Sequence, residues 1–469
     1  MFKRVLIANR GEIAVRVIRA CQELGIETVA VYSDADQNAI HVQLADLTYH
    51  IGQSDAQQSY LNMDVLLTAA KATKAEAIHP GYGFLSENAE FAEKVTNAGL
   101  VWIGPLPETI RQVGDKDVAR AAMLAAGLPM TKGTAPLTSH EEAFTEAAEN
   151  VGYPIILKPV SGGGGKSMFV AYNAEELANA LQIVDITKVP FYIEHYIEKS
   201  RHIEVQIMAD NFGNILHLGE RECSLQRRNQ KILEEAPSAA LTNDTRSKLG
   251  ALAVKAAKSI HYTNVGTVEF LLDVKTGEFY FMEINPRIQV EHAITEAITG
   301  IDLVRWQLRI ASGEPLSKRQ EDVTFTGHAI ECRINAEDPD KNFIPSPGLI
   351  DFYHEPGGPR IRVDSGINAG LSVEPYYDSL IAKVIAHGRT RGDAIKIMER
   401  ALNEFRVDGV KTTILLHKRI LSDNYFRTGN IDTQFIKNRL PAYEETPPKL
   451  RLKDKKNIAD LINSSMYYG

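Results

Sequence analysis

The chain has 469 residues, 44% hydrophobic and 24% charged, with a formal net charge of -8. This is enough for about three globular domains, and the acidic balance argues against nucleic acid, whose binders carry a basic surface. The cysteines Cys21, Cys223 and Cys332 are too few and too far apart for a disulfide framework or zinc cluster. With no signal-peptide core and no apolar run near the ~18 residues of a membrane span, we expect a cytoplasmic protein.

The N-terminus predicts a βαβ unit with a parallel sheet. Residues 4–33 read as strand, helix and strand, with Gly25 ending the helix. Gly11 stands alone, so the GxGxxG fingerprint of a nicotinamide dehydrogenase is missing. Residues 76–88, "EAIHPGYGFLSEN", predict a short strand and then a turn that carries Tyr82 and Glu87. Ligands bind at such strand ends in open α/β sheets, and a plain connecting turn is the equal alternative.

The middle of the chain predicts a small lid. We interpret 104–110, "GPLPETI", as a linker, followed by helices through residue 128 that carry Lys116. Residues 130–196 show three strands, "YPIILK", "MFVAY" and "PFYIEH", around one helix at 174–184. This pattern is typical of a separate α+β unit.

A run of glycines in "ILKPVSGGGGKSMFV" invites comparison with a Walker A loop. The match fails because Val160 stands where the first glycine is required, and strand-like residues follow where a helix is required. Glycine costs roughly 0.5 to 1 kcal/mol relative to alanine in an ordered element, so four in a row indicate close backbone approach to a ligand. We interpret Gly162, Gly163, Gly164 and Gly165 as a flap over phosphates, with Lys158 as a phosphate or adenine contact.

From residue 202 the strands are longer and predominantly antiparallel in pattern, with helices expected at 244–260, 301–313 and 390–405. The most informative stretch is the hairpin "TVEFLLDVKTGEFYFMEIN". If residues 275–277 form its loop, Val274 opposes Glu278 and Glu269 opposes Glu283. Opposed carboxylates repel each other unless a cation lies between them. Magnesium is the simplest cation to expect, because proteins bind it through one or two carboxylates together with phosphate oxygens. A bulge could instead separate the two acids.

Residues 282–292, "MEINPRIQVEH", place Glu283, Asn285, Arg287, Gln289 and Glu291 at alternate positions. A solvated strand face is the ordinary explanation of such alternation. Beside a metal, Glu283 and Asn285 would be ligands, Pro286 would end the strand, and the last three side chains would surround a small anion.

A second alternating strand, "GHAIECRINAED", carries Arg333, which could stabilise an enolate-like oxygen. The stretch 221–237 adds Gln226 and Lys231, although its charges alone more often mean a solvated surface. The composition changes after Pro441, and there we expect a solvated extension.

These stretches carry a family resemblance over nearly the whole chain to about residue 440. "NRGEIAVRVIRA", "HPGYGFLSEN", "GGGGKSM", "QRRNQK", "EINPRIQVEH" and "ECRINAEDP", in this order and spacing, resemble biotin carboxylase, an ATP-grasp enzyme. The resemblance implies a mixed α/β and α+β fold with an N-terminal domain at 1–112, a linker and glycine-flap lid at 113–201, a mainly antiparallel catalytic domain at 202–446 and a tail at 447–469.

The resemblance also implies roles for individual residues. ATP contacts would come from Lys116, Lys158, the four flap glycines, the hinge residues Glu194, His195 and Ile197, and His202, Gln226 and Asn229. Magnesium or manganese would be held by Glu269, Glu283 and Asn285. Bicarbonate and biotin would contact Tyr82, Arg287, Gln289, Val290 and Arg333. Catalysis would fall to Lys231, Arg287, Glu291 as the base of bicarbonate, and Arg333 at the biotin enolate.

Two positions depart from the family pattern. Asn229 stands where histidine is usual and Ser167 where glycine is usual, from which we expect altered nucleotide affinity with the chemistry retained. The biotin attachment motif, a lysine between two methionines, is absent, so the resemblance implies a separate carrier protein and a carboxyltransferase on another chain. The acceptor could be acetyl-CoA, propionyl-CoA or pyruvate. Family members are commonly homodimers.

Two rival functions remain at this stage. A carboxylate–amine ligase or carbamoyl phosphate synthetase shares the ATP-grasp logic, although the latter would show an internal duplication. A regulatory protein with an inactive site is the other, and the intact set of acids and bases argues against it. Stimulation of ATP hydrolysis by biotin, by an amine, or by neither would separate the three.

Overall fold

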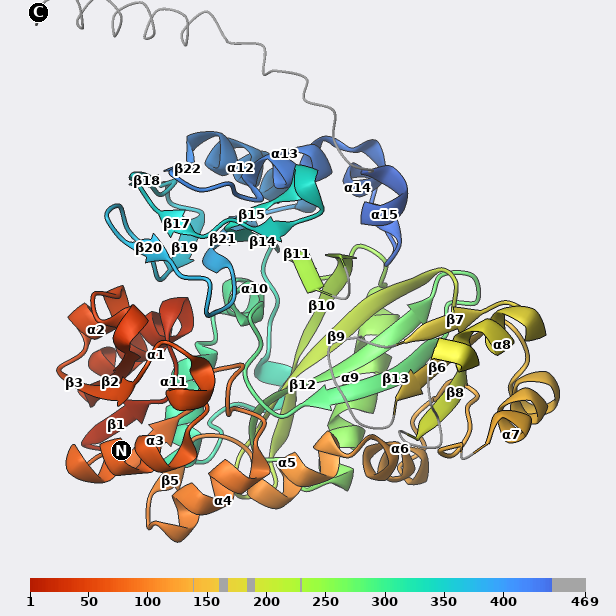
Figure 1. Ribbon diagram of the computed structural model, residues 1–469, viewed down its shortest axis with the longest axis horizontal. Coiled ribbons are helices and arrows are strands. Elements are labelled where there is room, and N and C mark those ends of the chain that lie inside the picture. Colours follow the sequence, from red (N-terminus) through yellow and green to blue (C-terminus); the bar gives the residue numbers. More distant parts are fainter. Residues whose placement is uncertain (138, 160–167, 184–189, 228–229, 441–469) are drawn as a thin grey trace, which may run out of the picture.

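The computed structural model describes residues 1–137, 139–159, 168–183, 190–227 and 230–440 (Figure 1). The predictions for Gly162 to Gly165, Ser167, Asn229 and the tail lie outside these residues. Across the described chain, no helix combines the length and apolar character needed to cross a membrane.

The N-terminal region contains a parallel five-stranded sheet in the order β3-β2-β1-β4-β5. Helix α1 (Gly11–Glu23) follows β1 and buries Ile13, Val17 and Ile18, as their helical spacing predicts. The predicted βαβ unit is therefore confirmed. The strands and remaining helices are β1 (Arg4–Ile7), β2 (Glu27–Ser33), β3 (Leu47–Gly52), β4 (Ala77–His79), β5 (Val101–Trp102), η1 (Asp34–Asp36), α2 (Ile40–Leu44), η2 (Ala56–Gln58), α3 (Met63–Ala72) and α4 (Ala89–Asn97).

The predicted linker at 104–110 is wrong for most of its length. Helix α5 (Pro107–Gly114) begins inside it, with proline at the first helical turn, where its missing N–H costs no hydrogen bond. Thr109, Ile110 and Val113 form its buried face. Helix α6 (Lys116–Ala125) follows at once, capped by the Asp115 side chain.

The lid is a three-stranded antiparallel sheet in the order β7-β6-β8. Ile155, Leu157, Leu177 and Ile193 form a buried core within it. The three predicted strands and the helix near 174–184 are present, but the prediction of a single helix is wrong, because an α-helix at His140–Thr145 and a π-helical segment at Glu146–Val151 precede the first strand. In Figure 1 the lid lies at the right, beyond α6. Its elements are α7 (His140–Thr145), a π-helical segment (Glu146–Val151), β6 (Ile155–Pro159), β7 (Phe169–Ala171), α8 (Ala174–Ile183) and β8 (Phe191–His195).

The rest of the chain is organised around an eight-stranded sheet, β13-β12-β9-β10-β11-β14-β21-β19, in which every neighbouring pair is antiparallel. The predicted helices are present as α9, α11 and α12. The sheet strands are β9 (Ser200–Ala209), β10 (Ile215–Arg227), β11 (Gln230–Ala236), β12 (Asn264–Asp273), β13 (Phe279–Asn285), β14 (His328–Asn335), β19 (Ile361–Ser365) and β21 (Leu380–Gly388). The helices are α9 (Asn243–Ser259), α10 (His292–Thr299), α11 (Leu303–Ala311), α12 (Arg391–Glu404), α13 (Ile414–Ser422), α14 (Asn424–Arg427) and α15 (Phe435–Arg439).

Short elements complete the C-terminal region. They include three two-stranded pairs, β15 with β16, β17 with β20 and β18 with β22. Their bounds are η4 (Gln320–Asp322), β15 (Glu337–Asp338), η5 (Pro339–Lys341), β16 (Ile344–Pro345), β17 (Gly348–Leu349), β18 (Phe352–His354), β20 (Ser372–Val373) and β22 (Arg406–Asp408).

In the β12–β13 hairpin the predicted pairing of Glu269 with Glu283 is confirmed, but the predicted position of the loop is wrong. Glu269 does oppose Glu283, but the register shifts immediately beyond Glu269. The turn is closed between Asp273 and Glu278, one residue earlier than predicted, while the Val274 N–H donates to the Lys199 carbonyl. The bulge compensates for the longer loop, and the two acids therefore still face each other.

Candidate active site

The predicted site residues converge on one cleft of about 2130 Å³. This exceeds the ~300 to 1,000 Å³ of a usual small-molecule site, so it can hold a nucleotide together with a second substrate. Its lining comes from the N-terminal region, the lid and the large sheet. The predicted site residues that line it are Tyr82, Lys116, Lys158, Glu194, His195, Ile197, His202, Gln226, Lys231, Glu269, Glu283, Asn285, Arg287, Gln289, Val290 and Arg333.

Lys231 on β11 is the electrostatic centre of the site. Its Nζ lies 2.6 Å from Glu204, 2.9 Å from Glu269 and 2.7 Å from Glu291. Burial alone would lower the pKa of Lys231, but these carboxylates outweigh it and raise the pKa well above its usual value. Lys231 therefore remains protonated and holds the three acids together.

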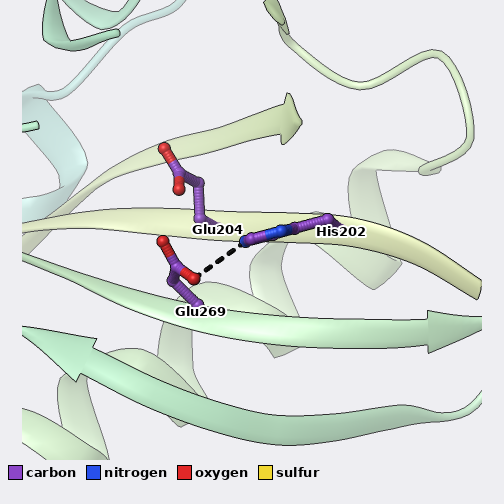
Figure 2. A group of neighbouring side chains, drawn as sticks. All are labelled: His202, Glu204 and Glu269. Atoms are coloured by element: carbon purple, nitrogen blue, oxygen red, sulfur yellow. Dashed lines mark ion pairs between the residues drawn. The ribbon is translucent and has the colours of Figure 1, made fainter. Parts of the chain in front are cut away.

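Figure 2 shows how β9 and β12 bring His202, Glu204 and Glu269 together. The His202 Nε2 lies 2.9 Å from the Glu269 Oε2. Burial opposes a charge on His202, yet Glu269 raises its pKa, so the imidazolium is favoured. One imidazole and two carboxylates at this spacing could hold a metal ion. Glu269, however, already has Lys231 and His202 as positively charged neighbours, which reduces its need for a metal.

Sequence reasoning missed Glu204 and its partner Arg221. Both are fully buried, and the Arg221 Nε lies 2.5 Å from the Glu204 Oε1. The alternation of His202, Glu204 and Gln206 along β9 was the available signal, because alternate residues of a strand share a face. Arg221 joins this face by donating to Gln206 at 2.6 Å.

Glu283 lines the cleft and is a candidate ligand for a divalent ion. Its side chain is exposed in the cleft, and the described residues give it no hydrogen bond or salt bridge. The pKa of Glu283 is raised, mainly because the carboxylate is partly removed from water and also because the negative charges of Glu269 and Glu87 lie near it. The charges of His202 and Lys231 offset this rise only in part, which fits a site for a hard ion bound through oxygen. The assignment of Glu269, Glu283 and Asn285 as ligands stays a prediction.

The chain turns after Asn285, where β13 ends before Pro286 as predicted. Arg287 is then fixed from several sides, since its Nε lies 2.6 Å from Glu87 and its Nη1 donates to Gln289 at 2.7 Å. Gln289 in turn donates to Glu269 at 3.3 Å. The guanidinium and the amide are therefore pre-oriented beside the carboxylate pair, as an anion site requires.

Glu291 lies beneath the cleft, fully buried just before α10. Its Oε1 contacts Lys231 at 2.7 Å and its Oε2 contacts Arg333 at 2.8 Å. Burial would raise its pKa, but the charges of Lys231, Arg333 and Arg221 hold the pKa well below its usual value. Glu291 is ionised at neutral pH and can accept a proton.

Lys158 on β6 of the lid and Arg120 on α6 also line the cleft. The Lys158 Nζ lies 2.7 Å from Glu194, whose other oxygen contacts Arg120 at 2.9 Å. The N–H groups of His195 and Tyr196 donate to the carbonyls of Lys132 and Pro154, respectively. These contacts fix the hinge at the end of β8. Arg120 was not anticipated from the sequence.

Tyr82 reaches the cleft from the turn after β4, and its hydroxyl donates to Glu12. Glu12 also contacts the fully buried ammonium of Lys383 at 3.1 Å. Lys383 donates to the Val290 carbonyl at 2.7 Å. Through these contacts the N-terminal turn is tied to the backbone next to Glu291. Tyr82 and Glu87 both line the cleft, and the expectation that a ligand binds at this turn stays a prediction.

Family models match most of the chain. They are described as biotin carboxylase, N-terminal domain, at residues 1–110; carbamoyl-phosphate synthase L chain, ATP binding domain, at 115–319; and biotin carboxylase C-terminal domain, at 331–438.

Similar proteins are known over nearly the full length. Biotin carboxylase 1 of Bacillus subtilis is 52% identical over 442 residues, which cover 93% of this chain and 98% of that protein. One of the pyruvate carboxylase subunits of Methanothermobacter thermautotrophicus is 47% identical, covering 98% and 95%. The biotin carboxylase domain dimer of 2-oxoglutarate carboxylase from Hydrogenobacter thermophilus, solved with MgADP, ADP and bicarbonate, superposes with a TM-score of 0.91 at 47% identity, covering 95% and 100%.

Proposed function

The chain belongs to the biotin carboxylase family, and from this premise we propose that it uses ATP and bicarbonate to carboxylate the N1 atom of biotin on a separate carrier protein. The observation that carries the proposal is the position of Glu291. This ionised carboxylate lies just beneath the cleft and contacts both Lys231 and Arg333, which line it. Glu291 therefore lies between Lys231, which can offset the charge of a phosphate, and Arg333, which can offset the charge of a developing oxyanion.

In the first half-reaction Glu291 takes the proton of bicarbonate. The bicarbonate oxygen attacks the γ-phosphorus of ATP, ADP leaves, and carboxyphosphate forms. Lys231 offsets the negative charge of the reacting phosphoryl group. Mg²⁺ or Mn²⁺, held by Glu269, Glu283 and Asn285, would supply Lewis-acid polarisation of the phosphates.

The substrates are held by groups on two walls of the cleft. Arg287, Gln289 and Val290 would bind bicarbonate, a role supported by the fixed orientation of the Arg287 guanidinium. The nucleotide would lie against the lid and hinge. Its expected contacts are Lys116, Lys158, Gly162, Gly163, Gly164, Gly165, Glu194, His195, Ile197, His202, Gln226 and Asn229.

In the second half-reaction carboxyphosphate breaks down to carbon dioxide and phosphate. The phosphate takes the N1 proton of biotin, and N1 attacks carbon dioxide to give carboxybiotin. Arg333 stabilises the negative charge on the ureido oxygen of biotin, and Tyr82 borders the biotin side of the cleft. Closure of the lid would exclude water from carboxyphosphate.

The proposal includes partners and a cellular location. The biotin carrier and the carboxyltransferase would be separate chains, and the protein would form a homodimer, as the biotin carboxylase domain of the 2-oxoglutarate enzyme does. The named relatives carboxylate different acceptors, so the acceptor stays open between acetyl-CoA, propionyl-CoA, pyruvate and 2-oxoglutarate. Three buried free thiols support a reducing, cytoplasmic location.

The division into units at 1–112, 113–201, 202–446 and 447–469 is part of the same proposal. Its support is that the lid and the N-terminal sheet each have their own buried core. Limited proteolysis should cut near these boundaries first, and cleavage inside β12 or β14 instead would contradict the division.

The function is tested by ATP cleavage with bicarbonate, measured with and without free biotin. Biotin should stimulate the bicarbonate-dependent rate, whereas stimulation by an amine and not by biotin would overturn the proposal. Glu291→Gln should keep ATP binding, measured by calorimetry, and should reduce bicarbonate-dependent cleavage to background. Turnover unchanged from that of the unsubstituted enzyme would rule out Glu291 as the base.

A further inference from the structure

A second pair of opposed acids lies deeper in the large sheet. Glu234 on β11 and Glu331 on β14 are cross-strand partners, and both are fully buried. Cβ atoms at such positions are about 4.5 to 5.5 Å apart. The carboxylate oxygens of both residues have no hydrogen-bond partner among the described residues, but Glu234 forms an ion pair with Arg333. Two buried carboxylates on neighbouring strand positions favour protonation of one of them, because each disfavours the negative charge of the other.

Arg333 connects this pair to the base of the proposed reaction. Its Nη2 atom lies 2.5 Å from the Glu234 Oε1 and 2.8 Å from the Glu291 Oε2. One guanidinium nitrogen therefore has two carboxylate partners. When Glu291 takes up a proton it loses its charge, and the ion pair with Glu234 remains.

We propose that Glu234 is the positioning residue of Arg333, holding its guanidinium in place for biotin during the part of the cycle in which Glu291 is protonated, while Glu331 stays neutral beside it. The proposal rests on the proposed function and deepens it. It names Glu234 as the residue that keeps Arg333 in place between the first half-reaction, in which Glu291 takes a proton, and the second, in which Arg333 contacts biotin. Glu234 acts through Arg333 and needs no contact with a substrate.

The surrounding charges support this division of roles. Burial, and then the charges of Glu234 and Glu291, raise the pKa of Glu331 well above its usual value; Lys383 and Arg333 oppose this rise. Burial also raises the pKa of Glu234 to about 7, against the opposing charge of Arg333. Glu234, which is ion-paired with Arg333, is therefore the member of the pair that ionises more readily, and it titrates around neutral pH. The titratable and charged groups around the pair are Cys223, Lys231, Glu291, Cys332, Arg333 and Lys383.

Glu234→Gln tests the proposal, with the unsubstituted enzyme assayed alongside. We expect ATP cleavage with bicarbonate but without biotin to stay within twofold, and the biotin-dependent kcat to fall tenfold or more. The part of the pH profile of biotin-dependent kcat that titrates near pH 7 should also disappear. Equal loss of both rates, or loss of neither, overturns the proposal. An unsubstituted enzyme that biotin does not stimulate overturns the proposed function instead.

Glu331→Gln is the matched control, because it removes the opposed partner, which already lacks charge. Its biotin-dependent kcat should stay within about threefold of the unsubstituted enzyme, and a loss as large as that of Glu234→Gln contradicts the proposal. Glu234→Asp keeps the charge and should retain more biotin-dependent rate than Glu234→Gln. Should the Gln variant fail to fold, the Asp variant decides: selective loss of the biotin-dependent rate supports the proposal, and equal loss of both rates overturns it.

Discussion

Two pairs of acids face each other across neighbouring strands of the same sheet, and their surroundings resolve the repulsion differently. Glu269 and Glu283 border the open cleft, where Lys231 and His202 supply positive charge to Glu269. Glu234 and Glu331 are sealed beneath it, and Glu331 has no hydrogen-bonding partner in the described chain.

The difference shows that the same cross-strand motif has two chemical outcomes. Where cations are within reach, the pKa of Glu269 falls well below its usual value, because Lys231 and His202 outweigh the effect of burial. Where burial dominates, the pKa of Glu331 rises and the group keeps its proton. A buried acid thus stays ionised where nearby cations outweigh the effect of burial, and it retains a proton where burial outweighs them.

The largest effect is expected from removing Lys231, the cation beside the first pair of acids. Lys231→Met leaves Glu204, Glu269 and Glu291 without their shared ammonium, so the free energy of unfolding should fall by about 3 kcal/mol. Bicarbonate-dependent ATP cleavage should drop on the order of a hundredfold or more. Urea unfolding and steady-state kinetics measure the two effects.

Lys248→Met is the control for that substitution, because Lys248 and Asp244 form an exposed pair on α9. Exposed pairs contribute little to stability, so this variant should unfold and turn over like the unsubstituted enzyme. A Lys231→Met protein as stable as this control would refute the role of Lys231 as the shared counter-ion.

A smaller effect concerns pH and the second pair. The pKa of Glu234 is raised from 4.5 to about 7 in the folded state. The folded protein therefore binds more protons than the unfolded chain between these values, and stability falls as pH rises through them. The unfolding free energy of the unsubstituted protein should decrease relative to that of Glu234→Gln by roughly 1 to 3 kcal/mol from pH 5 to pH 8. Parallel pH curves from urea titrations would contradict the raised pKa.

The smallest effect concerns the open pair. Glu283→Gln removes the repulsion with Glu269, so in the absence of nucleotide and metal the unfolding free energy should increase by about 0.2 to 1 kcal/mol. The thermal stabilisation produced by MgADP should decrease, because one expected metal ligand is lost. ADP with a chelator is the control and should shift both proteins equally. A variant stabilised by MgADP as much as the unsubstituted protein would exclude Glu283 as a ligand.

Much of the fold could be predicted because its signals are local. The apolar spacing of α1 and the turn chemistry around Gly277 depend on residues close in sequence. The linker prediction was wrong because a proline at the first turn of α5 suits a helix as well as a loop. The loop of the β12–β13 hairpin was misplaced by one residue because a bulge leaves no mark in the alternation of side chains.

The buried part of the site could not be predicted by the same means. Glu204, Arg221 and Lys383 are charged residues without exposure, and a sequence pattern assigns such residues to a solvated face. Their partners lie on strands far apart in the chain. Only the pairing of β11 with β14 makes Glu234 and Glu331 neighbours.

The sequence by itself determined which residue types alternate along each strand, the run of four glycines that predicts a flap, and the succession of motifs that identify the family. The tertiary structure decided which of the acids has a cation and which keeps a proton. The physical reason is that the charge of a carboxyl group depends on its distance from water and from other charges. That distance is set by strand pairing and packing, which join residues such as Lys231 and Glu291 across 60 positions of the chain.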